Sequence, residues 1–235
     1  MSRTAPPVST LPGGLVTLPS VYRPQADTRL LAEALAREDV DTDTRVLEIG
    51  TGTGALALNA ARRGAEVTAV DVSWTAVATA RVNALLRRLP VRVLHGDFVA
   101  CTAGRRYDLI VTNPPYVPAP AALPSHGPER AWDAGPDGRM VIDRICAHAS
   151  ALLGPGGVLL MVHSAMSRAG ETLERLSGAG LTAEITAEAT VPWGPVLRSR
   201  RSWLEGQGLA HTAETREELV VIRARKSSTW QQTPS

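Results

Sequence analysis

The chain has 235 residues, 44% of them hydrophobic, and a formal net charge of +2 at pH 7. This length fits a single α/β domain with a sizeable core, and so small a net charge argues against a broad basic surface for nucleic acid. The cysteines, Cys101 and Cys146, have no metal-ligand spacing and favour a reduced compartment. With no signal-peptide h-region and no run near about 18 apolar residues, we expect a cytoplasmic protein without a metal site or a membrane span.

The beginning of the chain predicts a tail and then a helix. Residues 1–20 are rich in Pro, Ser, Thr and Gly, and we expect a flexible N-terminal tail or a lid. Four apolar residues then recur at helical spacing: Leu30, Leu31, Ala34 and Leu35. They predict a helix from 27 to about 37, with Asp27 and Thr28 supplying capping chemistry at its start.

Beyond this helix, strands and helices alternate. Apolar runs predict strands over 44–49, 65–70, 91–94, around Ile110, and over 157–162, 182–186 and 219–222. Helical patterns cover 55–63, 74–88, 140–153 and 169–179. A Pro/Gly-rich insertion, 117–138, is longer than ordinary strand-to-helix connections. The alternation predicts an α/β domain over residues 21–225 with a doubly wound, largely parallel sheet, followed by a flexible C-terminal tail, 226–235.

The segment Thr112-Asn113-Pro114-Pro115-Tyr116 directly follows the fourth strand. Two consecutive prolines hold φ near about −65°, and Pro114 keeps Asn113 out of the helical region, so the corner is stiff. It presents two acceptors, Asn113 Oδ1 and the Pro114 carbonyl, beside the ring of Tyr116. Two acceptors beside a ring suit a planar NH₂ group, whose hydrogens can be bound while its faces pack. Plain turn chemistry is the alternative interpretation.

Other informative residues follow the first three strands, at the edge where doubly wound sheets bind ligands. Three glycines open the helix after the first strand: Gly50, Gly52 and Gly54. They let the backbone approach a ligand closely. Asp71 ends the second strand, the usual place for an acid that binds ribose hydroxyls. Asp97 and Phe98 follow the third strand, where a carboxylate and a ring can hold an adenine.

A glycine-rich loop alone would fit a dinucleotide-binding fold equally well. Here the spacing is Gly-x-Gly-x-Gly, and Glu48, Asp97 and the Asn-Pro-Pro-Tyr corner have no role in a nicotinamide enzyme. Together these features resemble the S-adenosylmethionine-dependent methyltransferases of the Rossmann-like class that methylate a planar amino or amide nitrogen. The resemblance implies a seven-stranded sheet, mostly parallel, with an antiparallel last strand.

Residues outside the cofactor loop sharpen the resemblance. The segment from Val21 to Thr28 is similar to the N-terminal segment of HemK-type glutamine methyltransferases, and more closely to their short archaeal and eukaryotic form. Three later segments are similar to the same group: 131–139, 191–195 and 218–223. Arg23 and Ala26 stand where that group usually carries acids, and Ala134 where it usually carries glycine.

This resemblance implies methylation of a glutamine side chain in the Gly-Gly-Gln motif of a peptide-chain release factor. It assigns the chemistry to Asn113, Pro114, Pro115 and Tyr116, which would orient the amide nitrogen without a general base. The implied cofactor is S-adenosylmethionine. Its implied ligands are Thr28, Glu48, Gly50, Thr51, Gly52, Gly54, Asp71, Val72, Asp97, Phe98 and Asn113. Asp97 as a turn cap and Thr28 as a helix cap are the structural alternatives.

Other functions and partners stay open at this point. Asn-Pro-Pro-Tyr corners also occur in methyltransferases that act on an exocyclic amine of a flipped nucleic-acid base, but the chain has no basic groove for this, so nucleic acid is an unlikely partner. A third hypothesis is that the protein methylates a nitrogen of a small molecule, in a pocket that the insertion closes. The resemblance to the eukaryotic form also suggests a small activating subunit, because that form is half of a heterodimer.

For some aromatic and basic residues, a structural and a functional interpretation are both possible. Trp132 and Trp193 fit either the substrate mouth or packing. The cluster Arg198, Arg200 and Arg201 is expected to be a solvated face, with contact to an acidic partner or RNA as the alternative. The five histidines are expected to be structural or solvated.

Overall fold

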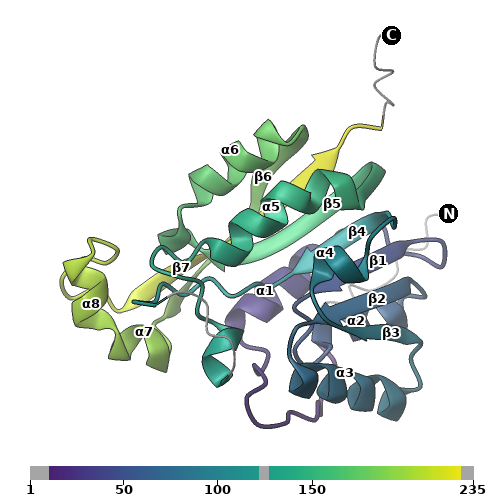
Figure 1. Cartoon of the computed structure of the whole chain (residues 1–235), viewed down its shortest axis with the longest axis horizontal. Helices are drawn as coiled ribbons and strands as arrows, with labels where there is room; N and C mark the ends of the chain where they lie inside the picture. The colour runs from purple at the N-terminus through teal and green to yellow at the C-terminus, as the bar shows by residue number, and fades with distance from the viewer. Residues whose placement is uncertain (1–10, 122–126, 229–235) are drawn as a thin grey trace, which may run out of the picture.

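The computed structural model describes residues 11–121 and 127–228. Figure 1 shows a twisted central sheet with helices on both of its faces. The seven strands lie in the order β3-β2-β1-β4-β5-β7-β6. Their bounds are β1 Arg45–Ile49, β2 Glu66–Asp71, β3 Val91–His95, β4 Tyr107–Thr112, β5 Leu153–Ser164, β6 Leu181–Pro192 and β7 Arg216–Lys226. Strand β7 runs antiparallel to both of its neighbours and the other pairs are parallel, which confirms the predicted fold class.

The helices form two layers on the sheet. Helices α1 (Ala26–Leu35), α2 (Ala55–Arg62) and α3 (Trp74–Arg87) cover one face, and α4 (Phe98–Cys101), α5 (Met140–Leu152) and α6 (Ala169–Gly178) cover the other. Two further short helices, α7 (Pro195–Ser199) and α8 (Arg201–Gly206), lie beyond one end of the sheet (Figure 1). The central strands are buried on both faces, as expected of parallel strands between helix layers.

Several boundaries differ from the sequence prediction. Strand β6 was expected over 182–186 and β7 over 219–222, but both are longer by several residues. The extra residues of β7 are mostly charged. Those of β6 beyond residue 186 mix small, polar and apolar types and are exposed or half exposed, because β6 is an edge strand, so an apolar run marks only the middle of this pair. Helices α4, α7 and α8 have four to six residues, too few for a helical repeat to appear in the sequence.

The start of α1 also corrects a prediction. The N-cap position is Gln25, without a side-chain cap, and Asp27 is the second residue of the helix. Its carboxylate does accept the backbone N–H of Thr28, yet its other oxygen faces the site described below. The proposed N-terminal tail lies outside the described residues up to residue 10. Within 11–20 the backbone has no helix or strand, but Val16 exchanges two hydrogen bonds with the side chain of Asn83 on α3.

Within the described ranges, no helix combines the length and apolar character needed to cross a bilayer.

Candidate active site

The predicted site residues lie at or just after the carboxyl ends of β1 to β4 or, for Thr28, on α1, and all but Gly54 border one cavity. Strands β1 and β4 are the two where the sheet order reverses. Ile49 lies beside Thr112 in the parallel register, and the Thr112 hydroxyl donates to the Ile49 carbonyl at 2.9 Å. The next residues, Gly50 and Asn113, are therefore neighbours. A cavity of about 940 Å³ opens over them, within the range of small-molecule and cofactor sites.

Asn113 is held in one orientation by the first helix. Its Nδ2 donates to Asp27 Oδ2 at 3.0 Å and to Thr28 Oγ1 at 3.3 Å. Because a carboxylate can only accept, the NH₂ end of the amide must face Asp27. The opposite end, Oδ1, has no hydrogen-bond partner among the described residues, and Asn113 lines the cavity. The side chain is thus preset to act as an acceptor.

Asp27 is the centre of this arrangement, a role that the sequence did not reveal. Its side chain is 3% exposed. Besides Asn113, the hydroxyls of Tyr22 and Tyr116 donate to its Oδ2, at 2.8 and 3.2 Å. Burial, reinforced by the Asp27 charge, raises the pKa of Tyr116 well above its usual value, so the phenol stays a donor. Two donors of the corner, Asn113 and Tyr116, therefore tie the helix to it through Asp27, and Tyr22 adds a bond from the segment before the helix.

The far side of the corner contacts two residues: Ser167, and Gly138 at the end of the insertion. The Tyr116 carbonyl accepts from the Ser167 hydroxyl at 2.8 Å. Gly138, at φ +71°, lies against the same carbonyl so closely that any Cβ there would collide with it. Pro114 and Pro115 line the cavity between these two supports. The corner is consequently braced on both sides by contacts that hold its backbone still.

Glu48 lies beneath the glycine loop. Its Oε2 accepts from the Thr51 hydroxyl and from the backbone N–H of Ala57, the latter at 3.1 Å. Burial raises the pKa of this carboxyl to about 8. Glu48 therefore supports the glycine loop through these two hydrogen bonds, and it also borders the cavity.

Asp71 ends β2 as predicted and borders the cavity with Val72. Its two oxygens accept from the backbone N–H groups of Gly52, at 3.0 Å, and Ser73, at 2.8 Å. Burial raises its pKa above the usual value. A carboxylate has about four acceptor positions, so two remain for a ligand such as a ribose diol.

Asp97 and Phe98 have partners that the sequence did not indicate. Asp97 Oδ1 caps α4 by accepting from Val99 and Ala100, and Oδ2 pairs with Arg144 at 2.5 Å. The Arg144 guanidinium also lies 5.2 Å from the centre of the Phe98 ring. All three residues border the cavity. The turn-cap alternative thus describes one oxygen of Asp97, and Arg144 joins the group at the predicted adenine end.

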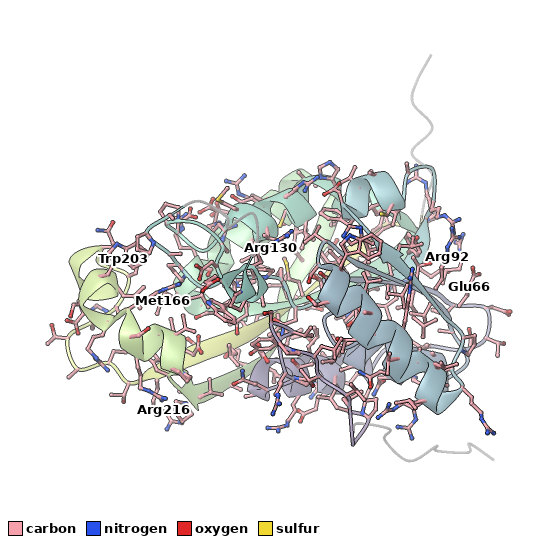
Figure 2. All side chains as sticks on the ribbon, turned by 60° about the horizontal axis from the view of Figure 1, so that its bottom comes forward. Glu66, Arg92, Arg130, Met166, Trp203 and Arg216 are labelled. Atoms are coloured by element: carbon pink, nitrogen blue, oxygen red, sulfur yellow. The ribbon has the colours of Figure 1, made fainter. Side chains whose placement is uncertain are left out.

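Both described parts of the insertion border the cavity, and they are joined to each other at their base. The insertion pairs with itself through Val117 and Trp132, whose N–H and carbonyl are 2.8 Å apart, and carries the short 3₁₀ helix Pro128–Ala131. Arg130 of this helix lies in the middle of the molecule, between α3 and the α7–α8 end (Figure 2). Trp132 lines the cavity. Residues 122–126 lie outside the described ranges.

Trp193 and the arginine cluster serve packing. Trp193 is buried with Leu197, Leu204 and Ala210. Arg198 donates to the Trp193 carbonyl, and the Arg201 guanidinium lies 4.7 Å from the centre of the Trp193 ring.

Arg200 forms a two-bond ion pair with Asp133 of the insertion, at 2.6 and 3.0 Å. The expectation of a solvated arginine face is wrong for Arg200, because its side chain is only 19% exposed.

Among the histidines, His163 is buried on β5, His95 stacks on Trp74, and His126 lies outside the described residues.

Comparisons with known proteins identify the relatives of this chain. The family model "Methyltransferase small domain" matches residues 15–124. The chain is 34% identical over 188 residues to the "Putative protein N5-glutamine methyltransferase" of Methanocaldococcus jannaschii, covering 76% of this chain and 90% of that protein. It is 44% identical over 150 residues to the release factor glutamine methyltransferase of Deinococcus radiodurans, covering 60% of this chain but only 52% of that protein. Against such bacterial relatives the chain spans little more than half of their length.

Solved structures share the fold. The E. cuniculi Mtq2-Trm112 complex, described as responsible for methylation of the eRF1 translation termination factor, aligns with a TM-score of 0.61 at 24% identity, covering 88% of this chain and 99% of that one. The T. thermophilus 16S rRNA N2 G1207 methyltransferase, in complex with AdoMet and guanosine, aligns with a TM-score of 0.56 at 26% identity, covering 87% of this chain and 44% of that one.

Proposed function

The chain belongs to the family of S-adenosylmethionine-dependent protein glutamine methyltransferases, and from this premise we propose that it methylates the glutamine side chain in the Gly-Gly-Gln motif of a peptide-chain release factor. The observation that carries the proposal is the fixed Asn113 amide, which Asp27 and Thr28 hold by its NH₂ end. A protein substrate of this kind works on the ribosome, so the proposal also implies a cytoplasmic location.

The chemistry calls for placement more than for proton transfer. An amide nitrogen is a weak nucleophile because its lone pair is delocalised. In our proposal, Asn113 Oδ1 and the Pro114 carbonyl accept the two N–H bonds of the glutamine amide and turn its nitrogen toward the methyl donor. As that nitrogen gains positive charge, both acceptors bind it more strongly than in the ground state, which stabilises the transition state selectively. Tyr116, held through its hydroxyl by Asp27, would cover the amide plane.

The residues at the cavity fit S-adenosylmethionine. Bound there, this cofactor supplies an electrophilic methyl group on a sulfonium. Asp71 has two acceptor positions left for the ribose hydroxyls, and the glycine loop brings backbone close to the cavity. Phe98 and the Asp97–Arg144 pair would flank the adenine, with Asp97 still able to accept a further hydrogen bond.

We further propose that a small activating subunit binds over α3 and the open edge of β3. Apolar side chains follow one exposed side of α3 and include Trp74, 66% exposed, and Leu85, 78% exposed, together with Val82 and Leu86. Strand β3 is an edge of the sheet, where a further strand can pair once the Arg81 side chain releases the Val93 carbonyl that it binds. The Mtq2 chain, to which this fold is similar, is itself part of a two-chain complex. Apolar patches of this kind commonly mark interfaces.

The subunit proposal is tested by co-expression with a Trm112-type protein from the same organism. We expect a 1:1 complex with wild-type protein, and loss of that complex with the double change Leu85→Glu and Leu86→Glu. The control makes the same kind of change, Ser177→Glu, at an exposed position of α6 in the other helix layer. A complex that survives the double change would remove α3 as the binding surface.

Methyl transfer is tested with labelled S-adenosylmethionine and three acceptors side by side. These are a purified release factor, its variant with alanine for the glutamine of Gly-Gly-Gln, and total tRNA with rRNA. We expect label on the release factor alone, absent from the alanine variant. Label only on RNA would instead mean methylation of a base amine, and label on neither, with the cofactor bound, would mean a small-molecule substrate.

A further inference from the structure

A second carboxyl group borders the substrate end of the cavity. Strand β7 pairs antiparallel with β5, with Leu219 opposite Ser164 at the carboxyl end of β5. The residues that precede Leu219 therefore extend beyond β5, over the same edge of the sheet that carries Asn113. Glu217 and Leu219 both line the cavity, whereas Glu218 is exposed, as the alternation of side chains along a strand requires.

The Glu217 carboxyl has the Ser164 hydroxyl as a neighbour: burial raises the pKa of the carboxyl, and the interaction with this hydroxyl partly offsets the rise. Because Ser164 Oγ already accepts the backbone N–H of Met166 at 3.3 Å, its own hydrogen is available for Glu217. Glu217 Oε2 is buried and has no hydrogen-bond partner within the described part of the chain. A buried acceptor without a partner is costly, and native proteins usually retain one only for a purpose.

The surroundings of Glu217 favour an N–H donor as the missing partner. Burial, with the like charge of Asp27 adding to it, raises the pKa of Glu217 to about 7. Neither Asp27 nor Glu217 forms an ion pair with any described arginine, lysine or histidine. The other titratable groups that face this region, Tyr22 and Tyr116, are donors already committed to Asp27. Asp27 itself accepts from four neighbours, so of these two carboxyl groups Glu217 is the one with an unsatisfied oxygen.

We propose that Glu217 is a positioning residue that accepts a hydrogen bond from an N–H group of the substrate polypeptide beside the methylated amide. The inference rests on the proposed function, in which Asn113 Oδ1 and the Pro114 carbonyl take both hydrogens of that amide. A second contact next to it fixes the direction from which the polypeptide enters the cavity. Glu217 thereby distinguishes a polypeptide from a free amide or a nucleic-acid base, neither of which offers a main-chain N–H at that place.

The test measures steady-state methyl transfer to the release factor for Glu217→Ala, Glu217→Gln and the matched control Glu218→Gln. We expect Glu217→Ala to raise KM for the release factor about tenfold, with cofactor binding unchanged. Glu217→Gln keeps an acceptor oxygen and should restore KM to within about threefold of wild type. Glu218→Gln should behave as wild type, because its side chain is exposed and does not line the cavity.

The pH profile separates this role from a structural one. In wild type, kcat/KM should fall as the pH drops below about 7, because protonation weakens the Glu217 acceptor. This acidic limb should vanish in Glu217→Gln and persist in Glu218→Gln. An unchanged KM in Glu217→Ala, or a limb that persists in Glu217→Gln, would overturn the inference. If wild type itself leaves the release factor unlabelled while binding the cofactor, the proposed function fails and the inference falls with it.

Discussion

The Nδ2 of Asn113 lies 3.0 Å from Oδ2 of Asp27, 86 residues earlier in the chain. This contact decides which end of the Asn113 amide faces the cavity, since a carboxylate offers no donor. It also joins the first helix to the corner after β4, so these two parts of the cavity wall are held together. In the proposed reaction, Asp27 acts on the substrate only through Asn113 and Tyr116.

Asp27→Asn should therefore impair catalysis without removing the cofactor. Donors from Thr28 reach one oxygen of Asp27, while Tyr22, Tyr116 and Asn113 reach the other. An asparagine sets its own NH₂ against one of these groups of donors: at the Oδ2 position it removes the acceptor of Asn113, and at the Oδ1 position it faces the Thr28 N–H and hydroxyl and disturbs the start of the helix. We expect kcat to fall by about tenfold to hundredfold, with cofactor affinity within about threefold of wild type. Unchanged kcat would show that Asn113 keeps its orientation unaided.

Asn113→Ala and Asp71→Ala should separate chemistry from cofactor binding. Removing the Asn113 acceptor should lower methyl transfer by at least about a hundredfold, while calorimetry still measures near-normal S-adenosylmethionine binding. Asp71→Ala removes the carboxyl that borders the proposed ribose position, so it should weaken cofactor binding itself, by about tenfold or more. Equal losses of cofactor affinity in the two variants would contradict these roles.

The sheet and the corner could be predicted from the sequence because short, continuous sequence patterns specify both. Buried parallel strands appear as apolar runs, and Asn113 to Tyr116 form one continuous motif. Asp27 did not stand out, because its partners come together only once α1 packs on β5, β6 and β7 with its first residues beside the corner that follows β4. Arg144 was missed for the same reason, since it reaches Asp97 from a different helix. Strand β7 was underestimated because its outer residues are mostly charged, and β6 because its outer residues mix polar with small and apolar types.

Glu48→Gln should flatten the pH dependence of stability. The native carboxyl has a pKa of about 8 because of burial, whereas the ordinary value is 4.5. Between these values the native protein keeps a proton that the unfolded chain has released. The free energy of unfolding should therefore fall as pH rises from about 5 to 8, by up to about 1.4 kcal/mol per pH unit from this group.

Urea unfolding at several pH values measures this slope directly. In Glu48→Gln the slope should be smaller, with a remainder from Glu217 and Asp71, whose pKa values burial also raises. The control Glu66→Gln changes an exposed carboxyl, labelled in Figure 2, and should keep the wild-type slope. A slope that is the same in all three proteins would mean that Glu48 is ionised in the native state.

Arg200→Ala should destabilise the protein far more than Arg45→Ala. Both arginines make two-bond ion pairs, Arg200 with Asp133 and Arg45 with Asp108. The side chains of the first pair are 19% and 11% exposed, against 48% and 40% for the second. Removing one partner of a mostly buried pair leaves the other charge without compensation, so we expect a loss of about 2–3 kcal/mol for Arg200→Ala. The solvated pair should contribute less than about 1 kcal/mol.

Because Arg200 also holds the carbonyl of Pro118, its loss should loosen the insertion at the mouth of the cavity. We therefore expect Arg200→Ala to raise KM for the release factor under conditions where the protein is fully folded, while Arg45→Ala leaves KM unchanged. Urea unfolding gives the two stabilities, and methyl-transfer kinetics give the two KM values. If both variants lose the same stability, the Arg200 pair is as well solvated in solution as the exposed pair, and the insertion must be held at its base by its backbone contacts alone.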